Sequence, residues 1–196
     1  MLFRSRRAYT REGYLHIANA LKAVRPDIAI TTDIIVGFPG ETEADLEQTL
    51  SLMDAVQFDG SFSFLYSPRP YTSAARLPDP VAVTHKKAWL QRVQERQRAH
   101  SMVQNTQWLG KPVDLIIEQT ADKADTAEGN ELLHQGRSAY NKVVHFTGKT
   151  RYTLGQRVTV TVEHATPAAL YGTAGDDYGR SLILTNESNR AYDRPV

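Results

Sequence analysis

The chain has 196 residues, 41% of them hydrophobic and 23% charged, values typical of a soluble globular protein large enough to bury a core. A formal net charge of +1 gives no overall attraction to nucleic acid, and the absence of cysteine excludes disulfides, thiolate metal sites and a cysteine nucleophile. No apolar run approaches the roughly 20 residues of a membrane span and no secretory signal is recognisable, so we expect a cytoplasmic protein.

The first predicted element is a helix that follows Thr10, a suitable N-cap residue, and ends before Pro26. The run Ile34-Ile35-Val36 then predicts a strand buried on both faces, as in parallel sheets. The helical spacing of the first element is carried by its apolar residues, Tyr14, Ile17, Ala18, Leu21 and Val24.

A glycine-rich turn, residues 37–40, follows this strand, and Thr42 to Asp45 then has the pattern of a capping box that opens an amphipathic helix. A second strand is predicted from Phe58 to Tyr66, and the proline-rich stretch 67–70 ends it. The order helix, strand, helix, strand predicts a parallel α/β layer, but two strands are too few for a closed parallel barrel. This half of the chain therefore has the pattern of an incomplete domain.

Residues 84–107 are helical in composition and locally basic, which suits either a solvated face on a packed helix or a binding face. Apolar residues then alternate in 113–117 and 158–162, with glycine-containing turns between them. This pattern predicts a small all-β barrel over about residues 108–172. The tail, 173–196, lacks a sustained apolar period, and we expect it to be disordered.

Two candidate ligand contacts stand at the ends of the predicted strands. The turn 37–42 would lie at the carboxyl edge of a parallel sheet, where ligands collect, and its glycines would allow close backbone approach. The alternative is a tight strand-to-helix connection without a ligand. Arg69, held between prolines at the same edge, suits a phosphate or carboxylate, or is simply a surface arginine.

The β region interleaves basic residues, among them Lys111, Arg137, Lys142 and Arg151, with aromatic ones. Basic and aromatic side chains on a small barrel suit RNA phosphates and stacked bases. A neutral barrel surface is the alternative, because several acidic residues precede the basic ones. The aromatic residues concerned are Tyr140, Phe146 and Tyr152.

Taken together, the motifs resemble a known family. The segment containing "TTDIIVGFPGET" and "YSPRP" resembles the later part of the radical S-adenosylmethionine domain of methylthiotransferases. The segment with "LHQGRSAYNKVVHFTG" and "LGQRVTV" resembles their TRAM domain, an RNA-binding barrel. The combination is most similar to the MiaB family, which modifies adenosine next to the tRNA anticodon. A sister family that modifies a ribosomal-protein aspartate usually carries an acidic pair where Arg69 and Pro70 stand.

The resemblance implies an α/β fold, a partial (βα) radical S-adenosylmethionine barrel, followed by a small all-β, OB-like TRAM barrel. The family uses S-adenosylmethionine and two four-iron, four-sulfur clusters, and clusters need cysteine thiolates that this chain lacks. It further implies a tRNA anticodon stem-loop and the missing N-terminal half of the enzyme as partners, with no catalytic or metal-binding residue in this chain. The implied cofactor contacts are Ile35, Gly37, Phe38, Gly40 and Glu41. The implied RNA contacts are Arg69, Lys111, Arg137, Lys142 and Arg151.

We therefore expect the C-terminal fragment of a tRNA-2-methylthio-N6-dimethylallyladenosine synthase that binds tRNA but is inactive alone. A stand-alone RNA-binding module and a fragment of the ribosomal-protein enzyme are the alternatives. Tyr71 and Ser73 depart from the family pattern, which has glycine and proline there, and we expect the bulky Tyr71 to alter that loop. The expected division is 1–83 for the partial α/β barrel, 84–107 for a connecting helix, 108–172 for the TRAM barrel and 173–196 for the tail.

Overall fold

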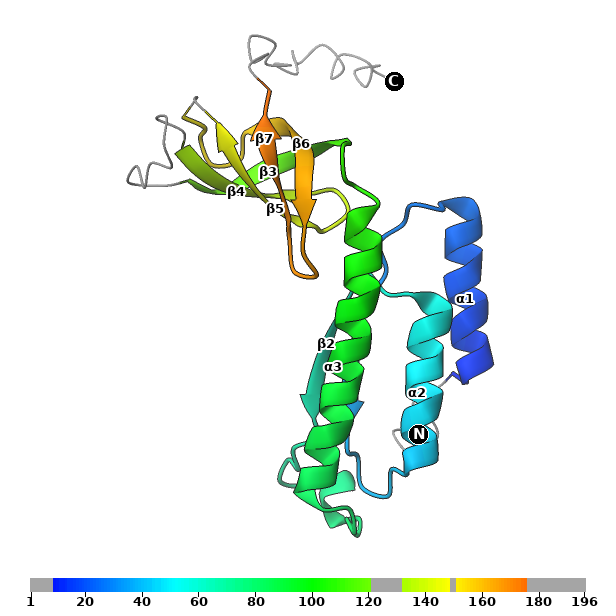
Figure 1. Ribbon diagram of the computed structural model, residues 1–196. Helices are drawn as coiled ribbons and strands as arrows, with labels where there is room; N and C mark the ends of the chain where they lie inside the picture. The colour runs from blue at the N-terminus through cyan, green and yellow to red at the C-terminus, as the bar shows by residue number, and fades with distance from the viewer. Residues whose placement is uncertain (1–8, 121–131, 149–150, 176–196) are drawn as a thin grey trace, which may run out of the picture.

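The computed structural model describes residues 9–120, 132–148 and 151–175. Parallel βα units come first and a closed five-stranded barrel follows, as the sequence predicts (Figure 1). Most of the expected tail lies outside the described residues, but its first residues belong to the last barrel strand.

The α/β half, residues 9–106, contains helices α1 (Arg11–Val24), α2 (Glu43–Val56) and α3 (Val83–Thr106) and strands β1 (Thr31–Val36) and β2 (Gly60–Leu65). A short 3-10 helix, Ala74–Arg76, precedes α3. The two strands pair in parallel, with Thr31 opposite Gly60 and Val36 opposite Leu65. None of the helices in the described residues is long and apolar enough to cross a membrane.

Local hydrogen bonds begin the first two helices where the sequence predicts. The Thr10 hydroxyl accepts the N–H of Gly13 at 3.2 Å. Thr42 and Asp45 form the predicted capping box, in which each side chain accepts the other residue's backbone N–H. Both caps satisfy amide groups that a helix start leaves without a partner inside the helix.

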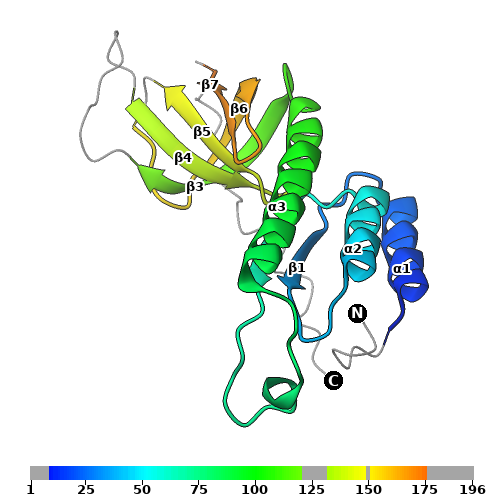
Figure 2. The same ribbon diagram turned by 60° about the horizontal axis from the view of Figure 1, so that its bottom comes forward.

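One core holds the α/β half together. Residues from α1, β1, α2 and α3 pack into a single cluster, and α3 runs from the sheet to the barrel (Figures 1 and 2). The buried members are Ala18, Val36, Leu46, Leu50, Met53, Val56, Phe58, Trp89 and Val93.

The prediction that β1 is buried on both faces is wrong. Ile35 is 48% exposed, and the residues that share its face on β2, Phe62 and Phe64, are 69% and 55% exposed. Helices cover the opposite face, toward which Val36 is buried. Within the described residues nothing packs over the face that carries Ile35, which we call the open face.

The barrel consists of β3 (Pro112–Thr120), β4 (Leu132–Ser138), β5 (Val143–Gly148), β6 (Arg157–Ala165) and β7 (Leu170–Ala174). The strands close in the order β3-β4-β5-β7-β6, and only the β5–β7 pair is parallel. Alternate residues point inward, as the period of two predicts. The buried core residues are Val113, Leu115, Ile117, Val144, Phe146, Tyr152, Val158, Val160, Val162, Ala165 and Leu170.

Candidate functional site

The turn after β1 requires its glycines. Gly37 and Gly40 have φ of +78° and +76°, in the left-handed region that other residues rarely adopt. A Cβ on Gly37 would also lie 2.7 Å from Cδ of Lys86, whose stem packs against the turn. The turn therefore combines a special backbone conformation with close packing against α3.

Glu41 closes this turn from inside the protein. It is 4% exposed, and its Oε2 accepts the N–H of Gly37 and, at 3.1 Å, the N–H of Phe38. Burial raises the pKa of the Glu41 carboxyl above its ordinary value of 4.5, against the opposing effect of these two backbone N–H groups. The carboxylate thus serves the turn itself, which is the role of a structural clamp.

We expect Glu41→Gln to leave the fold intact, because one amide oxygen can replace Oε2. The pKa of Glu41 is raised in the folded state. The stability contribution of Glu41 is therefore fully present below the ordinary pKa of 4.5 and is lost as the pH rises through the folded-state pKa. Glu41→Gln should remove this loss. Glu41→Ala should lower the free energy of unfolding by about 1–3 kcal/mol by leaving buried N–H groups unsatisfied. Urea unfolding measured at a series of pH values, from about 4 to about 8, tests both effects.

A cavity of about 570 Å³ opens beside β1, α1 and α2. Ile35 and Phe38 line it, and the Phe38 ring meets Tyr66 edge-on at a centroid distance of 5.1 Å. Of the five residues predicted to contact a cofactor, these two line the cavity, whereas Gly37, Gly40 and Glu41 form the turn behind it. Apolar and aromatic residues make up about half of its lining, and its charged residues are Arg11, Glu12, Asp33 and Asp45.

Arg69 lies in the loop that leaves β2 at the same sheet edge as the turn. The two strand ends are joined there by the Tyr66 N–H, which donates to the Val36 carbonyl at 2.8 Å. Arg69 is exposed, and its carbonyl accepts the Thr72 hydroxyl at 2.8 Å. Tyr71 in this loop has φ of +66° and a fully exposed side chain. A glycine would suit that conformation better, in line with the residue usual in the resembled family.

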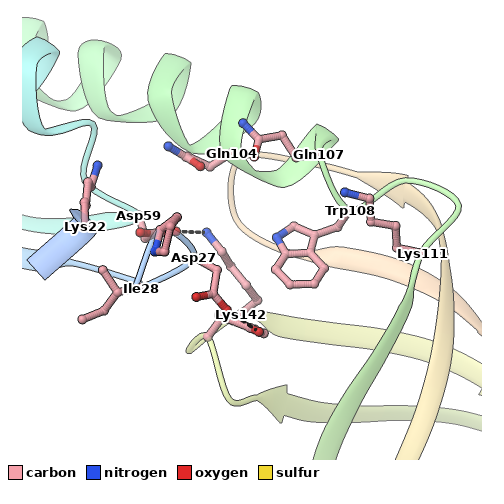
Figure 3. A pocket seen from close by; sticks show the side chains of 11 residues that line it. Lys22, Asp27, Ile28, Asp59, Gln104, Gln107, Trp108, Lys111 and Lys142 are labelled. Atoms are coloured by element: carbon pink, nitrogen blue, oxygen red, sulfur yellow. Dashed lines mark hydrogen bonds and ion pairs between the residues drawn. The ribbon is translucent and has the colours of Figure 1, made fainter. Parts of the chain in front are cut away.

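Lys142 does not lie on the outer surface of the barrel. Its Nζ is 2.9 Å from Oδ1 of Asp59, an ion pair whose side chains are 8% and 16% exposed, and Figure 3 shows it directed into the α/β half. The neighbouring Tyr140 hydroxyl donates to Asp27 at 2.8 Å, and its ring lies 4.9 Å from that of Trp108. We call this contact between the α/β half and the β4–β5 turn the seam.

The seam also contains a polar cavity of about 220 Å³, which Figure 3 shows from close by. Nearby, Nδ2 of Asn105 at the end of α3 donates to the Thr166 carbonyl in the β6–β7 turn at 2.7 Å. Two barrel turns are therefore tied to the α/β half. The side chains around the cavity include Lys22, Gln104, Gln107, Trp108 and Lys111.

The remaining predicted RNA contacts are not gathered into one patch. Arg137 donates to Glu118 at 2.8 Å and to Asn141 at 3.1 Å, so an acidic partner offsets part of its charge. Lys111 is exposed at the end of the barrel near the seam. Arg151 is exposed beyond the far end of β5, whose six residues span roughly 20 Å.

The aromatic residues that the sequence pairs with these cations are not surface groups. Phe146 and Tyr152 are 1% and 3% exposed inside the barrel, and Tyr140 belongs to the seam. The prediction that these three rings are available for stacking is therefore wrong. Packing of the barrel core uses two of them and the seam uses the third.

The basic side chains of α3 favour the packed, solvated interpretation of that helix. Arg92 pairs with Glu43 and Glu47 on α2, and Arg96 pairs with Asp54. These pairs tie α3 to α2. Because Arg92 and Arg96 already pair with acidic residues of the protein, this side of α3 is poorly suited to binding a ligand.

Comparison with known proteins gives relatives that match almost the whole chain. A tRNA-2-methylthio-N(6)-dimethylallyladenosine synthase of Staphylococcus haemolyticus is 41% identical over 180 residues, 92% of this chain and 34% of the relative. Similarly named synthases of Staphylococcus epidermidis and Aromatoleum aromaticum are 38% and 40% identical, over 90% and 85% of this chain. The chain spans about a third of the length of these relatives, and no protein-family model matches it.

Proposed function

The chain is a homologue of the MiaB tRNA methylthiotransferases over about a third of their length. We propose that it is the C-terminal portion of such an enzyme and that it binds tRNA. The observation that carries this proposal is the extent of the similarity, which covers both the βα units and the barrel. The RNA would be the anticodon stem-loop. The names of the relatives support a tRNA substrate over a ribosomal protein.

We infer that this chain alone does not catalyse methylthio transfer. Iron–sulfur clusters are held by cysteine thiolates, and the chain contains no cysteine. Its residues therefore do not fit a cluster. Any methylthio transfer would require ligands from sequence that this chain does not contain.

The cavity beside β1, α1 and α2 fits one wall of an S-adenosylmethionine site. Ile35 and Phe38 present apolar surface to the cavity, as suits the face of an adenine ring. In the proposed full-length enzyme S-adenosylmethionine would supply the methyl group. Titrating S-adenosylmethionine into the Glu41→Gln variant tests whether Glu41 only holds the turn or contacts the cofactor. If Glu41 only holds the turn, the variant should bind as tightly as the parent chain. If Glu41 contacts the cofactor, the variant should bind more weakly.

RNA binding by the full chain should depend strongly on salt, because phosphate contacts release counterions. Lys111→Ala and Arg151→Ala should each weaken binding of a labelled anticodon stem-loop several-fold. Each should also reduce the slope of log K against log[salt] by about 0.7 to 0.9, the effect of one lost phosphate contact. Fluorescence anisotropy across a salt series measures both quantities.

Lys87→Ala with Arg98→Ala is the matched control for the two barrel variants taken together, because it removes two exposed charges from α3. This control should retain the affinity of the parent chain. Equal losses in the barrel and α3 variants would contradict a barrel-specific surface. Absence of salt-dependent binding by the parent chain would overturn the proposed function.

A stand-alone RNA-binding module is the second candidate. The barrel favours it, because its strands close without help from the α/β half and its core is separate. Adding the remaining two thirds of a homologous synthase as a separate polypeptide distinguishes the two. A stable complex supports the enzyme portion, and no association supports the module.

A further inference from the structure

The outer surface of the barrel carries a row of four side chains that cross four adjacent strands. Strand register places Gln135 opposite His145, His145 opposite Tyr171, and Tyr171 opposite His164. The flanking residues Val144, Phe146 and Leu170 on β5 and β7 point inward, and Gly172 is buried. We call Gln135, His145, Tyr171 and His164 the outer row.

Two rings of the outer row are stacked, and a third packs against them at an interplanar angle of 47°. The His145 and Tyr171 rings are 5.2 Å apart and 20° from parallel, and the His164 ring is 5.9 Å from that of Tyr171. An irregularity in the β6–β7 register between Val162 and His164 accompanies the exposure of His164. Tyr171 is 39% exposed, so ring surface remains accessible to a ligand.

The chemistry of the outer row favours nucleobases over phosphates. It contains no lysine or arginine, and Glu163 beside it accepts the Thr173 hydroxyl at 2.8 Å, placing negative charge nearby. Aromatic rings stack on bases of any sequence, and the Gln135 amide can both donate to and accept from a base edge. Base pairs inside a duplex have no free face for such a stack, so a ligand with unpaired bases fits the outer row best.

We propose that the outer row is a stacking site for unpaired RNA bases, centred on Tyr171. This inference rests on the proposed RNA binding and adds where the bases lie and why single-stranded RNA is selected. The outer row takes the stacking role that the sequence pattern predicts for Tyr140, Phe146 and Tyr152, because those three rings lie in the seam and the barrel core.

The test compares Tyr171→Ala, Tyr171→Phe and His164→Ala in the full chain. The probes are a labelled anticodon stem-loop and a fully paired duplex of matching length. Tyr171→Ala should weaken stem-loop binding about 5- to 150-fold, the range for loss of one base–aromatic stack. Tyr171→Phe should bind as the parent does, His164→Ala should show a smaller loss than Tyr171→Ala, and duplex binding should not change.

Tyr71→Ala is the control, because Tyr71 is a fully exposed tyrosine in the loop after β2 of the α/β half. If the parent chain binds the stem-loop but Tyr171→Ala and His164→Ala bind it equally well, the outer row is not the site and the proposed function stands. Equal losses for stem-loop and duplex would also overturn the stacking site. If the parent chain binds no RNA, the proposed function fails and this inference fails with it.

Discussion

Replacing Gly172 with alanine should unfold the barrel or lower its free energy of unfolding by at least about 4 kcal/mol, a size reached by few single substitutions. Gly172 lies on β7, opposite Val162 of β6. An added Cβ would be 1.9 Å from the Thr161 carbonyl oxygen and 2.8 Å from its carbonyl carbon. Both are backbone atoms of the paired strand, so relief requires separating β6 from β7 and losing ladder hydrogen bonds.

Gly175→Ala is the matched control, three residues along the same segment, where an added Cβ meets nothing within 4 Å. It should unfold within about 0.5 kcal/mol of the parent chain. Urea unfolding followed by far-UV circular dichroism measures both variants. A Gly172→Ala protein as stable as the Gly175→Ala protein would contradict the close approach of the two strands.

This substitution also connects the barrel to function. Gly172 follows Tyr171 on β7, so displacement of that strand would remove the outer row together with the fold. Core packing of the α/β half uses a separate cluster. We therefore expect Gly172→Ala to lose RNA binding while α1, α2 and α3 keep much of their helical signal.

Features that depend on near neighbours in the chain could be predicted from the sequence. The caps at Thr10 and Thr42 need partners only three residues away, and the parallel order of β1 and β2 follows from the helix between them. The alternation of β3 and β6 likewise marked the barrel. Each of these depends on local hydrogen bonding or on a periodicity that the sequence displays.

Features that depend on what covers a surface could not be predicted in the same way. Ile35 has the residue type of a buried strand, yet its exposure is decided by the absence of a covering layer over the open face within the described residues. Lys142 has the residue type of an RNA contact, and its ion pair with Asp59 could not be predicted because Asp59 comes from a distant segment of the chain. For Phe146, alternation with His145 and Thr147 was a usable signal that the phenylalanine points inward and the histidine outward.

The seam should make a large contribution to stability through Asp59. Asp59→Ala removes the partner of the buried Lys142 and also the Oδ2 that accepts the Ile30 N–H at 3.0 Å. Removing one member of a buried pair leaves an uncompensated charge, and we expect a loss of about 3 kcal/mol, at the lower end of the usual range because the seam cavity can admit water. Lys142→Met, which leaves Asp59 its bond to Ile30, should cost less.

A double variant isolates the ion pair from the other role of Asp59. Asp59→Asn can still accept the Ile30 N–H, so Asp59→Asn with Lys142→Met removes both charges without leaving that donor unsatisfied. It should therefore be more stable than Asp59→Ala, measured by urea unfolding. Arg157→Met is the control, because it breaks an exposed pair with Asp114 and should cost less than about 1 kcal/mol.

The same variants decide between two roles for Lys142. As a seam residue, Lys142→Met should lower stability yet bind the anticodon stem-loop with the salt slope of the parent chain, because its ammonium faces Asp59. If Lys142 contacts RNA instead, Lys142→Met should reduce that slope by the amount expected for one lost phosphate contact, as predicted for Lys111→Ala. An Asp59→Ala protein that unfolds no more easily than Arg157→Met would show that the seam does not hold the barrel against the α/β half.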